Sequence, residues 1–142
     1  MSESTPNSHD QGNSSGGGFP FEDRRDFEDA ERGFIATIEP GVIHGAAGNV
    51  VYDMDEFAFL DAEGSPTVHP SLWRQSQLVQ KHGLFEVVEG IYQVRNFDLS
   101  NITFVEGDTG VIVIDPLISA ETAGAALALY REHRNAAVDL LL

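Results

Sequence analysis

Residues 102–116 read Ile-Thr-Phe-Val-Glu-Gly-Asp-Thr-Gly-Val-Ile-Val-Ile-Asp-Pro, and this stretch decides the predicted fold. Two short apolar runs, Ile102–Val105 and Val111–Ile114, flank a loop whose Gly and Asp residues favour a turn. The second run is entirely β-branched, which predicts a strand that is buried on both faces. Asp115 and Pro116 end this strand, because proline cannot continue a strand ladder. In α/β sheets a carboxylate in this position lies where the chemistry is usually found.

The residues around this stretch predict an antiparallel meander followed by a helix. Strands are expected over residues 85–88, 90–94, 102–105 and 111–114, with a loop over 95–101. The helix is expected from Ser119, its N-cap, to Arg134, with Ala123, Ala126, Leu127 and Tyr130 on its buried face. Residues 136–142 predict one more strand.

The upstream part of the chain divides into two segments. Residues 1–20 are rich in Ser, Gly and Asn and predict a disordered tail. Residues 21–83 predict an amino-terminal extension with short helices and a hairpin. The helices are expected over residues 22–34, with Asp23 as N-cap and Gly33 as C-terminal stop, and over 70–83, with Gly83 just past its end; the hairpin is expected over 42–52.

Two further features of the extension have simple structural interpretations. We expect Trp73 to pack against the next domain, although Trp73 and Arg74 could also be functional. Asp53, Asp55 and Glu56 form an acidic run without the Gly and later Glu of a calcium-binding loop, so we expect them at the surface.

Composition limits the possible partners. The chain has 142 residues, which suffices for one domain or for part of a larger one, and 42% apolar residues permit a core. A net charge of −15 argues against binding nucleic acid or anionic membranes. It indicates either high solubility or a salt-adapted host. The absence of Cys excludes disulfides and thiolate metal sites. The sequence shows no secretory signal and no apolar run of transmembrane length, so we expect a cytoplasmic location.

Residue spacing alone reveals no catalytic constellation. No two of the five histidines lie within four residues of each other, so no chelating pair is visible. The histidines are His9, His44, His69, His82 and His133. There is also no Gly-rich phosphate loop after a strand and no Gly-x-Ser-x-Gly elbow.

Several motifs resemble the amino-terminal region of bacterial alkylsulfatases, the SDS-hydrolase group of the metallo-β-lactamase superfamily. They are Ser-Leu-Trp-Arg-Gln at 71–75, Gly-Ile-Tyr-Gln-Val-Arg at 90–95, Asp-Leu-Ser-Asn at 98–101, Gly-Asp-Thr-Gly at 107–110 and Ile-Asp-Pro-Leu-Ile-Ser at 114–119. The resemblance covers about residues 20–135. It implies an α+β fold in which residues 84–142 start, but do not complete, a metallo-β-lactamase αββα sandwich.

The resemblance also implies a chemistry. Two zinc ions would activate a water that cleaves primary alkyl sulfates, such as dodecyl sulfate, into alcohol and sulfate, and the full-length enzyme would be a homodimer. The family's ligands begin in a His-x-His-x-Asp-His loop that this sequence does not reach, so we expect no zinc bound by this chain. Asp115 matches a family Asp that supports the metal-binding loop through hydrogen bonds. Alternatively, Asp115 only caps the turn into the helix that starts at Ser119.

Three functional hypotheses follow from these observations. The chain is the amino-terminal part of a zinc-dependent alkylsulfatase and is inactive alone, or it is a non-catalytic truncated fragment, or it belongs to another metallo-β-lactamase-fold hydrolase such as a thioesterase-like enzyme. Half of a sandwich would leave an unpaired sheet edge and an uncovered apolar face.

Overall fold

The computed structural model describes residues 21–134 and 138–141. Its strands are β1 (Phe34–Ala36), β2 (Val42–His44), β3 (Val50–Asp53), β4 (Gly83–Val88), β5 (Ile91–Arg95), β6 (Ile102–Glu106), β7 (Val111–Ile114) and β8 (Val138–Leu141). Its helices are α1 (Arg25–Glu31), the 3-10 helix η1 (Asp55–Asp61), α2 (Pro70–Val79) and α3 (Ala120–His133). The predicted disordered tail over residues 1–20 lies outside the described residues.

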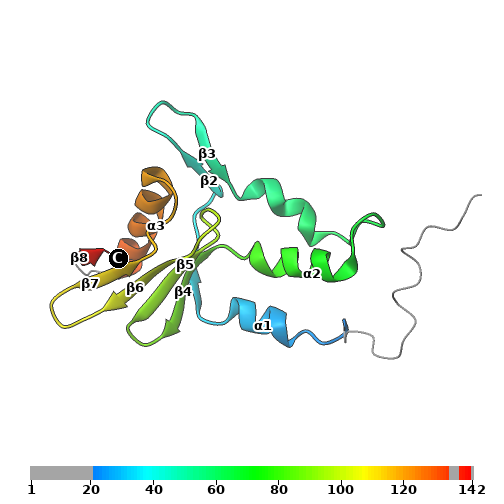
Figure 1. Ribbon diagram of the computed structural model, residues 1–142, viewed down its shortest axis with the longest axis horizontal. Helices are drawn as coiled ribbons and strands as arrows, with labels where there is room; N and C mark the ends of the chain where they lie inside the picture. The colour runs from blue at the N-terminus through cyan, green and yellow to red at the C-terminus, as the bar shows by residue number, and fades with distance from the viewer. Residues whose placement is uncertain (1–20, 135–137, 142) are drawn as a thin grey trace, which may run out of the picture.

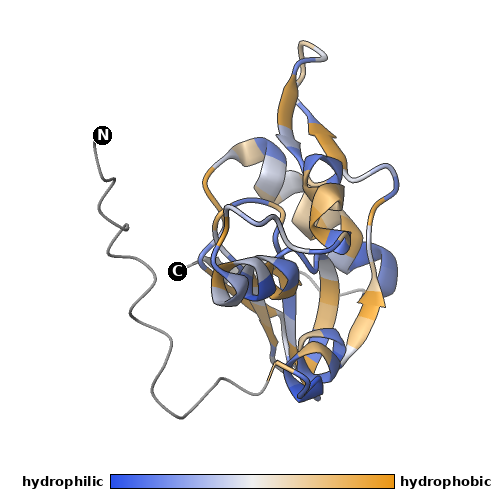
Figure 2. Cartoon of the chain, turned by 90° about the vertical axis from the view of Figure 1, so that its right-hand side faces the viewer, coloured by the Kyte–Doolittle hydropathy of each residue, from blue (hydrophilic) through white to orange (hydrophobic). Residues whose placement is uncertain are grey.

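A six-stranded sheet in the order β1-β4-β5-β6-β7-β8 forms the centre of the fold (Figure 1). The predicted meander from β4 to β7 is confirmed, with antiparallel pairing throughout, and β8 adds a parallel strand beside β7. The predicted hairpin is also confirmed as β2 and β3. Figure 2 shows hydrophobic stretches in the strands, including this hairpin, which projects from the rest of the molecule.

Helix α3 covers one face of the sheet. The ring of Tyr130 stacks on Phe104 with the centroids 4.1 Å apart, and the Tyr130 hydroxyl donates to Glu106 Oε1 at 2.7 Å. Ser119 is the N-cap, as predicted. The predicted buried face of this helix is correct at Ala126 and Tyr130 but shifted elsewhere. Thr122 and Leu129 are fully buried, whereas Ala123 and Leu127 are only half-buried.

The opposite face of β7 is open, which contradicts the prediction that this strand is buried on both faces. Val111 and Val113 are buried beneath α3, but Ile112 and Ile114 remain 38% and 43% exposed. Ile112 pairs with Val105 of β6. β-branched residues favour a β-strand whether one of its faces or both are covered. A run of them therefore does not show how many faces of the strand are buried.

Strand β1 was not predicted, because the expected helix over residues 22–34 is shorter. Helix α1 ends at Glu31, and the chain enters the sheet at Phe34 beside β4. Gly33 has φ +74°, and a Cβ there would lie 2.0 Å from Glu86 O. Gly83 was predicted to follow α2 directly, but α2 ends at Val79 and Gly83 opens β4 with φ +133°. Both glycines therefore serve the close β1–β4 approach.

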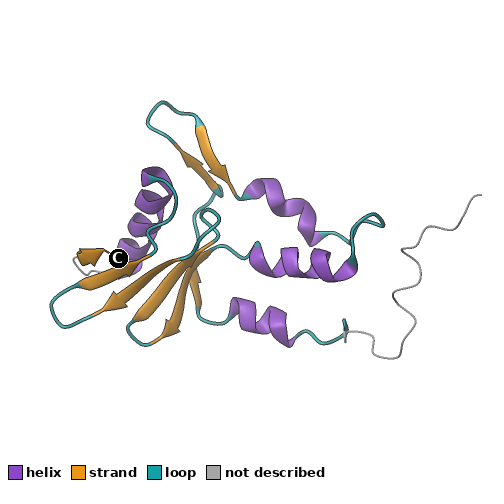
Figure 3. Ribbon diagram, viewed as in Figure 1, coloured by secondary structure: helices purple, strands orange, loops and turns teal. Residues whose placement is uncertain are grey.

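The helices of the extension lie together on the side of the molecule away from α3 (Figure 3). Trp73 packs edge-on against Phe59 of η1, with ring centroids 6.0 Å apart, and its Nε1 donates to Ala62 O at 3.3 Å. The prediction that Trp73 packs against the next domain is therefore wrong. Among the described residues, no helix is long and apolar enough to cross a membrane.

The acidic run precedes η1 and stabilises its start. Asp53 Oδ1 accepts the backbone N–H groups of Asp55 and Glu56 at 3.0 and 3.2 Å, so it pairs two N–H groups at the start of η1, whose N-cap is Met54. Asp55 and Glu56 are exposed, in agreement with the predicted surface position, while Asp53 is half-buried. Asp23 was expected to be the N-cap of α1, but Arg24 holds that position.

Candidate functional site

The loop that joins β7 to α3 has an unusual backbone. Asp115 has φ +52° and Leu117 has φ +72°, both in the left-handed region that non-glycine residues rarely adopt. Each such residue costs about 1–3 kcal/mol and persists only where the surrounding structure holds it. Residues with this kind of strain cluster at functional sites, so the loop over residues 115–119 is the first candidate for function.

The carboxylate of Asp98 holds this loop. Asp98 lies in the β5–β6 loop and is only 4% exposed. Its Oδ2 accepts the backbone N–H of Ile118 at 2.9 Å and the hydroxyl of Thr122 at 2.8 Å. Its Oδ1 accepts the backbone N–H of Ser100 at 2.8 Å. One buried carboxylate therefore joins two loops, because all three of these donors point at it.

The start of α3 completes this hydrogen-bonded cluster. The Ser119 hydroxyl accepts the N–H of Thr122 at 3.1 Å, and the Thr122 hydroxyl accepts the N–H of Ser119 at 3.3 Å. This is a capping box, and Thr122 also belongs to the Asp98 cluster. The helix therefore starts at a point that Asp98 fixes relative to the sheet.

Asp115 lies near this cluster but does not take part in it. Strands β5 and β7 run in the same direction, because each is antiparallel to β6, so their carboxyl ends share one edge of the sheet. The Asp115 side chain is exposed and makes no hydrogen bond or ion pair with any described residue. The alternative that Asp115 caps the turn into α3 is therefore wrong, since Ser119 and Asp98 do this. Its support of a metal-binding loop stays a prediction.

Sequence reasoning missed Asp98, which lay in a predicted loop without a role. A local signal was present in the spacing Asp98-Leu99-Ser100. An Asp that accepts the N–H two residues later forms an Asx-turn, and this is the bond that Ser100 donates. The two longer-range bonds, to Ile118 and Thr122, span 20 and 24 residues and have no local signal.

The described histidines do not form a metal site. Within residues 21–134 and 138–141, no group of three or more His, Asp or Glu side chains could hold a metal ion. His69 caps α2 by accepting the N–H of Ser71 at its Nδ1, at 3.2 Å. His82 borders a cavity of about 590 Å³ between η1 and β4. Both ring nitrogens of His82 are buried without a hydrogen-bond partner in the described part of the chain, and burial lowers its pKa.

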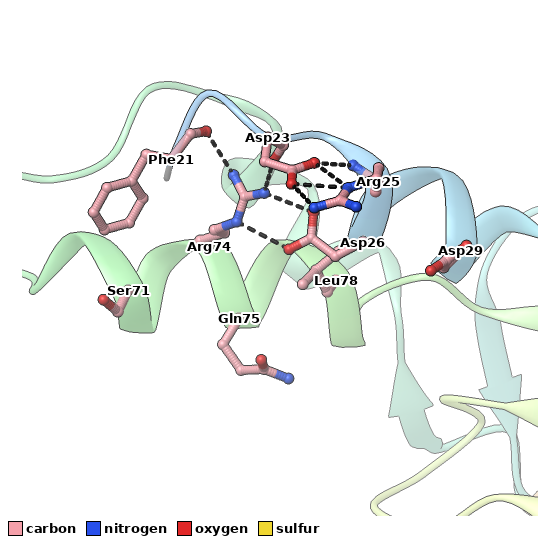
Figure 4. A pocket seen from close by; sticks show the side chains of 9 residues that line it. All are labelled: Phe21, Asp23, Arg25, Asp26, Asp29, Ser71, Arg74, Gln75 and Leu78. Carbon is pink, nitrogen blue, oxygen red and sulfur yellow. Dashed lines mark hydrogen bonds and ion pairs between the residues drawn. The ribbon is translucent and has the colours of Figure 1, made fainter. Parts of the chain in front are cut away.

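A second cavity, of about 500 Å³, lies between α1 and α2 and contains Arg74 (Figure 4). The Arg74 Nε and Nη2 donate to the two oxygens of Asp26 at 3.0 and 2.6 Å. Its remaining bonds go to the carbonyl oxygens of Phe21 and Asp23. Since the protein itself occupies this guanidinium, Arg74 joins the two helices and is not a free group for a substrate.

Replacing Asp98 and Asp115 by Asn should give opposite outcomes. Asp98→Asn removes the negative charge that accepts three hydrogen bonds. It also places an amide NH₂ group against the Ile118 N–H and the Thr122 hydroxyl, which are themselves donors. We therefore expect the free energy of unfolding to fall by about 2–3 kcal/mol. Asp115→Asn changes an exposed group and should shift it by less than about 0.5 kcal/mol. Urea unfolding followed by circular dichroism measures both. Equal effects would contradict the assignment of Asp98 as the anchor.

His82 should make stability depend on pH. Burial lowers the pKa of His82 in the folded protein below 6.5, so the unfolded chain takes up this proton at a higher pH than the folded protein does. The free energy of unfolding should therefore decrease from pH 7.5 to 5.5, with a slope below the single-proton limit of about 1.4 kcal/mol per pH unit. His82→Gln should reduce this decrease, and His133→Gln, at the end of α3, serves as the control. An unchanged pH dependence in His82→Gln would refute the prediction.

The sequence is 54% identical to a linear primary-alkylsulfatase of a Pseudomonas species over 117 residues. This alignment covers 81% of this chain and 17% of that protein. It is 50% identical to an alkyl/aryl-sulfatase of Saccharomyces cerevisiae over 116 residues, which cover 81% of this chain and 18% of that protein. It is 53% identical to an (R)-specific secondary-alkylsulfatase of a Pseudomonas species, also over 116 residues, which cover 81% of this chain and 17% of that protein. No family model matches the chain.

A solved structure agrees with these sequence matches. The stereoselective inverting sec-alkylsulfatase of a Pseudomonas species aligns with a TM-score of 0.76 and 53% identity, over 82% of this chain and 18% of that chain. This chain therefore spans less than a fifth of the length of the relatives it matches. The homologues of this chain are alkylsulfatases, and it corresponds to one segment of them.

Proposed function

We propose that this chain is the amino-terminal part of a zinc-dependent alkylsulfatase that hydrolyses primary alkyl sulfates, such as dodecyl sulfate, to alcohol and sulfate. The observation that carries this proposal is the 54% identity to a linear primary-alkylsulfatase over 81% of the chain. The matched relatives are named for primary, secondary and aryl substrates, and sulfate ester cleavage is common to all of them. None is named as a thioesterase, which favours the sulfatase over the thioesterase-like alternative.

The open face of the sheet supports the finer assignment to a metallo-β-lactamase sandwich. In an αββα sandwich each sheet has helices on one face and the other sheet on the opposite face. Here α3 covers one face, and Ile112 and Ile114 remain exposed on the other. A second sheet packed on this face would remove these β-branched side chains from water, at roughly 25 cal/mol per Å² of apolar surface.

The zinc ions belong to the proposal for the complete enzyme. The described residues contain no group of three or more potential ligands, so we assign them no metal and no chemical step. Their proposed role is positional. Asp98 fixes the loop over residues 115–119, and that loop carries Asp115, which would support the metal-binding loop through hydrogen bonds. Homodimerisation of the complete enzyme is a further part of this proposal and rests on the family resemblance.

A chimera tests the proposal. The aligned 117-residue segment of the Pseudomonas linear primary-alkylsulfatase is replaced by the matching residues of this chain. Because the two segments are 54% identical, we expect the chimera to release sulfate from dodecyl sulfate at a rate within about tenfold of the parent enzyme. In the chimera, Asp115→Asn should lower this rate by about 10–100-fold, the usual effect of losing a partner that orients metal ligands.

Glu121→Gln in the chimera is the matched control, since Glu121 is an exposed residue of α3. It should leave sulfate release unchanged. A chimera that folds and binds metal but releases no sulfate would contradict the sulfatase assignment and favour the non-catalytic alternative. This chain alone is expected to release no sulfate.

A further inference from the structure

Arg95 is a half-buried cation without a carboxylate partner. Three of the described Lys and Arg residues are half-buried, namely Arg74, Lys81 and Arg95. Arg74 binds Asp26, and Lys81 Nζ lies 2.7 Å from Glu31 Oε1. No described acidic residue forms an ion pair with Arg95, although 23 of the 142 residues in the sequence are acidic. An unpaired charge that is partly removed from water is costly, and such charges are normally compensated.

The surroundings of Arg95 fix its orientation but leave its end free. Its Nε donates to Gln93 Oε1 at 3.1 Å, and its guanidinium lies over the Phe85 ring, 4.4 Å from the centroid. Burial lowers the pKa of Arg95, but the guanidinium remains charged at neutral pH. Its two terminal nitrogens, Nη1 and Nη2, have no acceptor in the described part of the chain. This leaves the paired donors that bind oxyanions in a bidentate manner.

A cavity of about 480 Å³ lies beside Arg95, where the end of β5 meets α2. Its polar lining residues include Lys81, Tyr52, Ser100 and Asn101. Asp98 also lines the cavity, but both of its oxygens already accept hydrogen bonds from the protein. Lys81 is paired with Glu31, so Arg95 is the cation of this lining without an ion-pair partner among the described residues, and its free guanidinium nitrogens suit an anion.

The walls of this cavity are held in place. Asn96 has φ +56°, and its Nδ2 donates to Gln80 O at 3.0 Å, which joins the β5–β6 loop to the end of α2. The Tyr52 hydroxyl donates to Asn96 Oδ1 at 3.4 Å and ties the β2–β3 hairpin to the same residue. Asp98 holds the other end of the loop. A site of this kind does not have to order its loop when a ligand binds, which favours affinity.

We propose that Arg95 binds a small oxyanion, a sulfate or carboxylate group, in the cavity between the β5–β6 loop and α2. The two terminal guanidinium nitrogens contact two oxygens of the anion, and the Phe85 ring and Gln93 hold the guanidinium in place. The inference concerns binding by this chain and does not depend on sulfatase activity, so its failure would leave the proposed function untouched.

Titration with sodium sulfate tests the proposal, with sodium chloride added to keep the ionic strength constant. Nuclear magnetic resonance follows the Arg95 Nε–H signal and the amide signals of Ser100 and Asn101. We expect saturable shifts with a dissociation constant in the millimolar range. Arg95→Gln should weaken binding at least tenfold, and Arg95→Lys should weaken it less, because Lys keeps the charge but lacks the paired donors. Arg131→Gln, on the exposed surface of α3, is the control and should bind as the wild type does.

Sodium acetate in a parallel titration distinguishes the two anion classes. Tighter binding of sulfate identifies a sulfate group, and tighter binding of acetate identifies a carboxylate; either result supports the site if Arg95→Gln removes it. Linear shifts without saturation for both anions would overturn the proposal, and so would equal affinity in wild type and Arg95→Gln. If Arg95→Gln does not fold, the wild-type titration and Arg95→Lys still decide the outcome.

Discussion

The hydrogen bonds to the buried carboxylate of Asp98 are the interaction on which the rest of this structure depends. Three donors from two loops and a helix point at one side chain that is only 4% exposed. A buried carboxylate is tolerated only when its oxygens are paired, and hydrogen bonds to a charged group are stronger than neutral ones. The positions of the β5–β6 loop, the β7–α3 loop and the start of α3 are therefore coupled to each other.

This coupling explains how a strained loop persists at the edge of the sheet. The backbone of Asp115 and Leu117 would relax if the chain between β7 and α3 were free. It is held at one end by β7 and at the other by the Ile118 N–H on Asp98 and by the capping box of α3. Helix α3 is fixed in turn by Tyr130 against Phe104. The exposed carboxylate of Asp115 is thus presented by a rigid frame, which is what a residue that orients a neighbouring group requires.

Short-range sequence patterns predicted the strands, turns and helix cap that neighbouring residues determine. The strands from β4 to β7 follow period-two patterns or short apolar runs, with Gly-containing turns after β4 and β6, and Ser119 is a standard N-cap. Strand β1 was missed because Gly33 also fits the end of a helix, and its role against Glu86 appears only when β4 is beside it. The uncovered side of Ile112 and Ile114 was missed because a β-branched run carries no information about what lies on each face.

The candidate site was less predictable than the fold. Asp115 could be selected from its position after a buried strand and from the resemblance to alkylsulfatases. Asp98 and Arg95 could not be selected from the sequence. The role of Asp98 depends on hydrogen-bond donors that are distant in the sequence, and that of Arg95 depends on the absence of an ion-pair partner among the described residues. Ile118 and Thr122 lie 20 and 24 residues from Asp98 in the sequence. Among the described half-buried cations, Arg95 differs from Arg74 and Lys81 in having no ion-pair partner.

Hydrogen exchange of the Ile118 amide measures most directly whether Asp98 anchors the loop. The side chain of Ile118 is 68% exposed, and it lies in a loop, so an unanchored amide would exchange almost as fast as in an unfolded peptide. Because its N–H is bonded to the buried Asp98 carboxylate, we predict that it exchanges slowly, with a protection factor on the order of 10³ or more. A protection factor below about 10 would contradict the central role of Asp98.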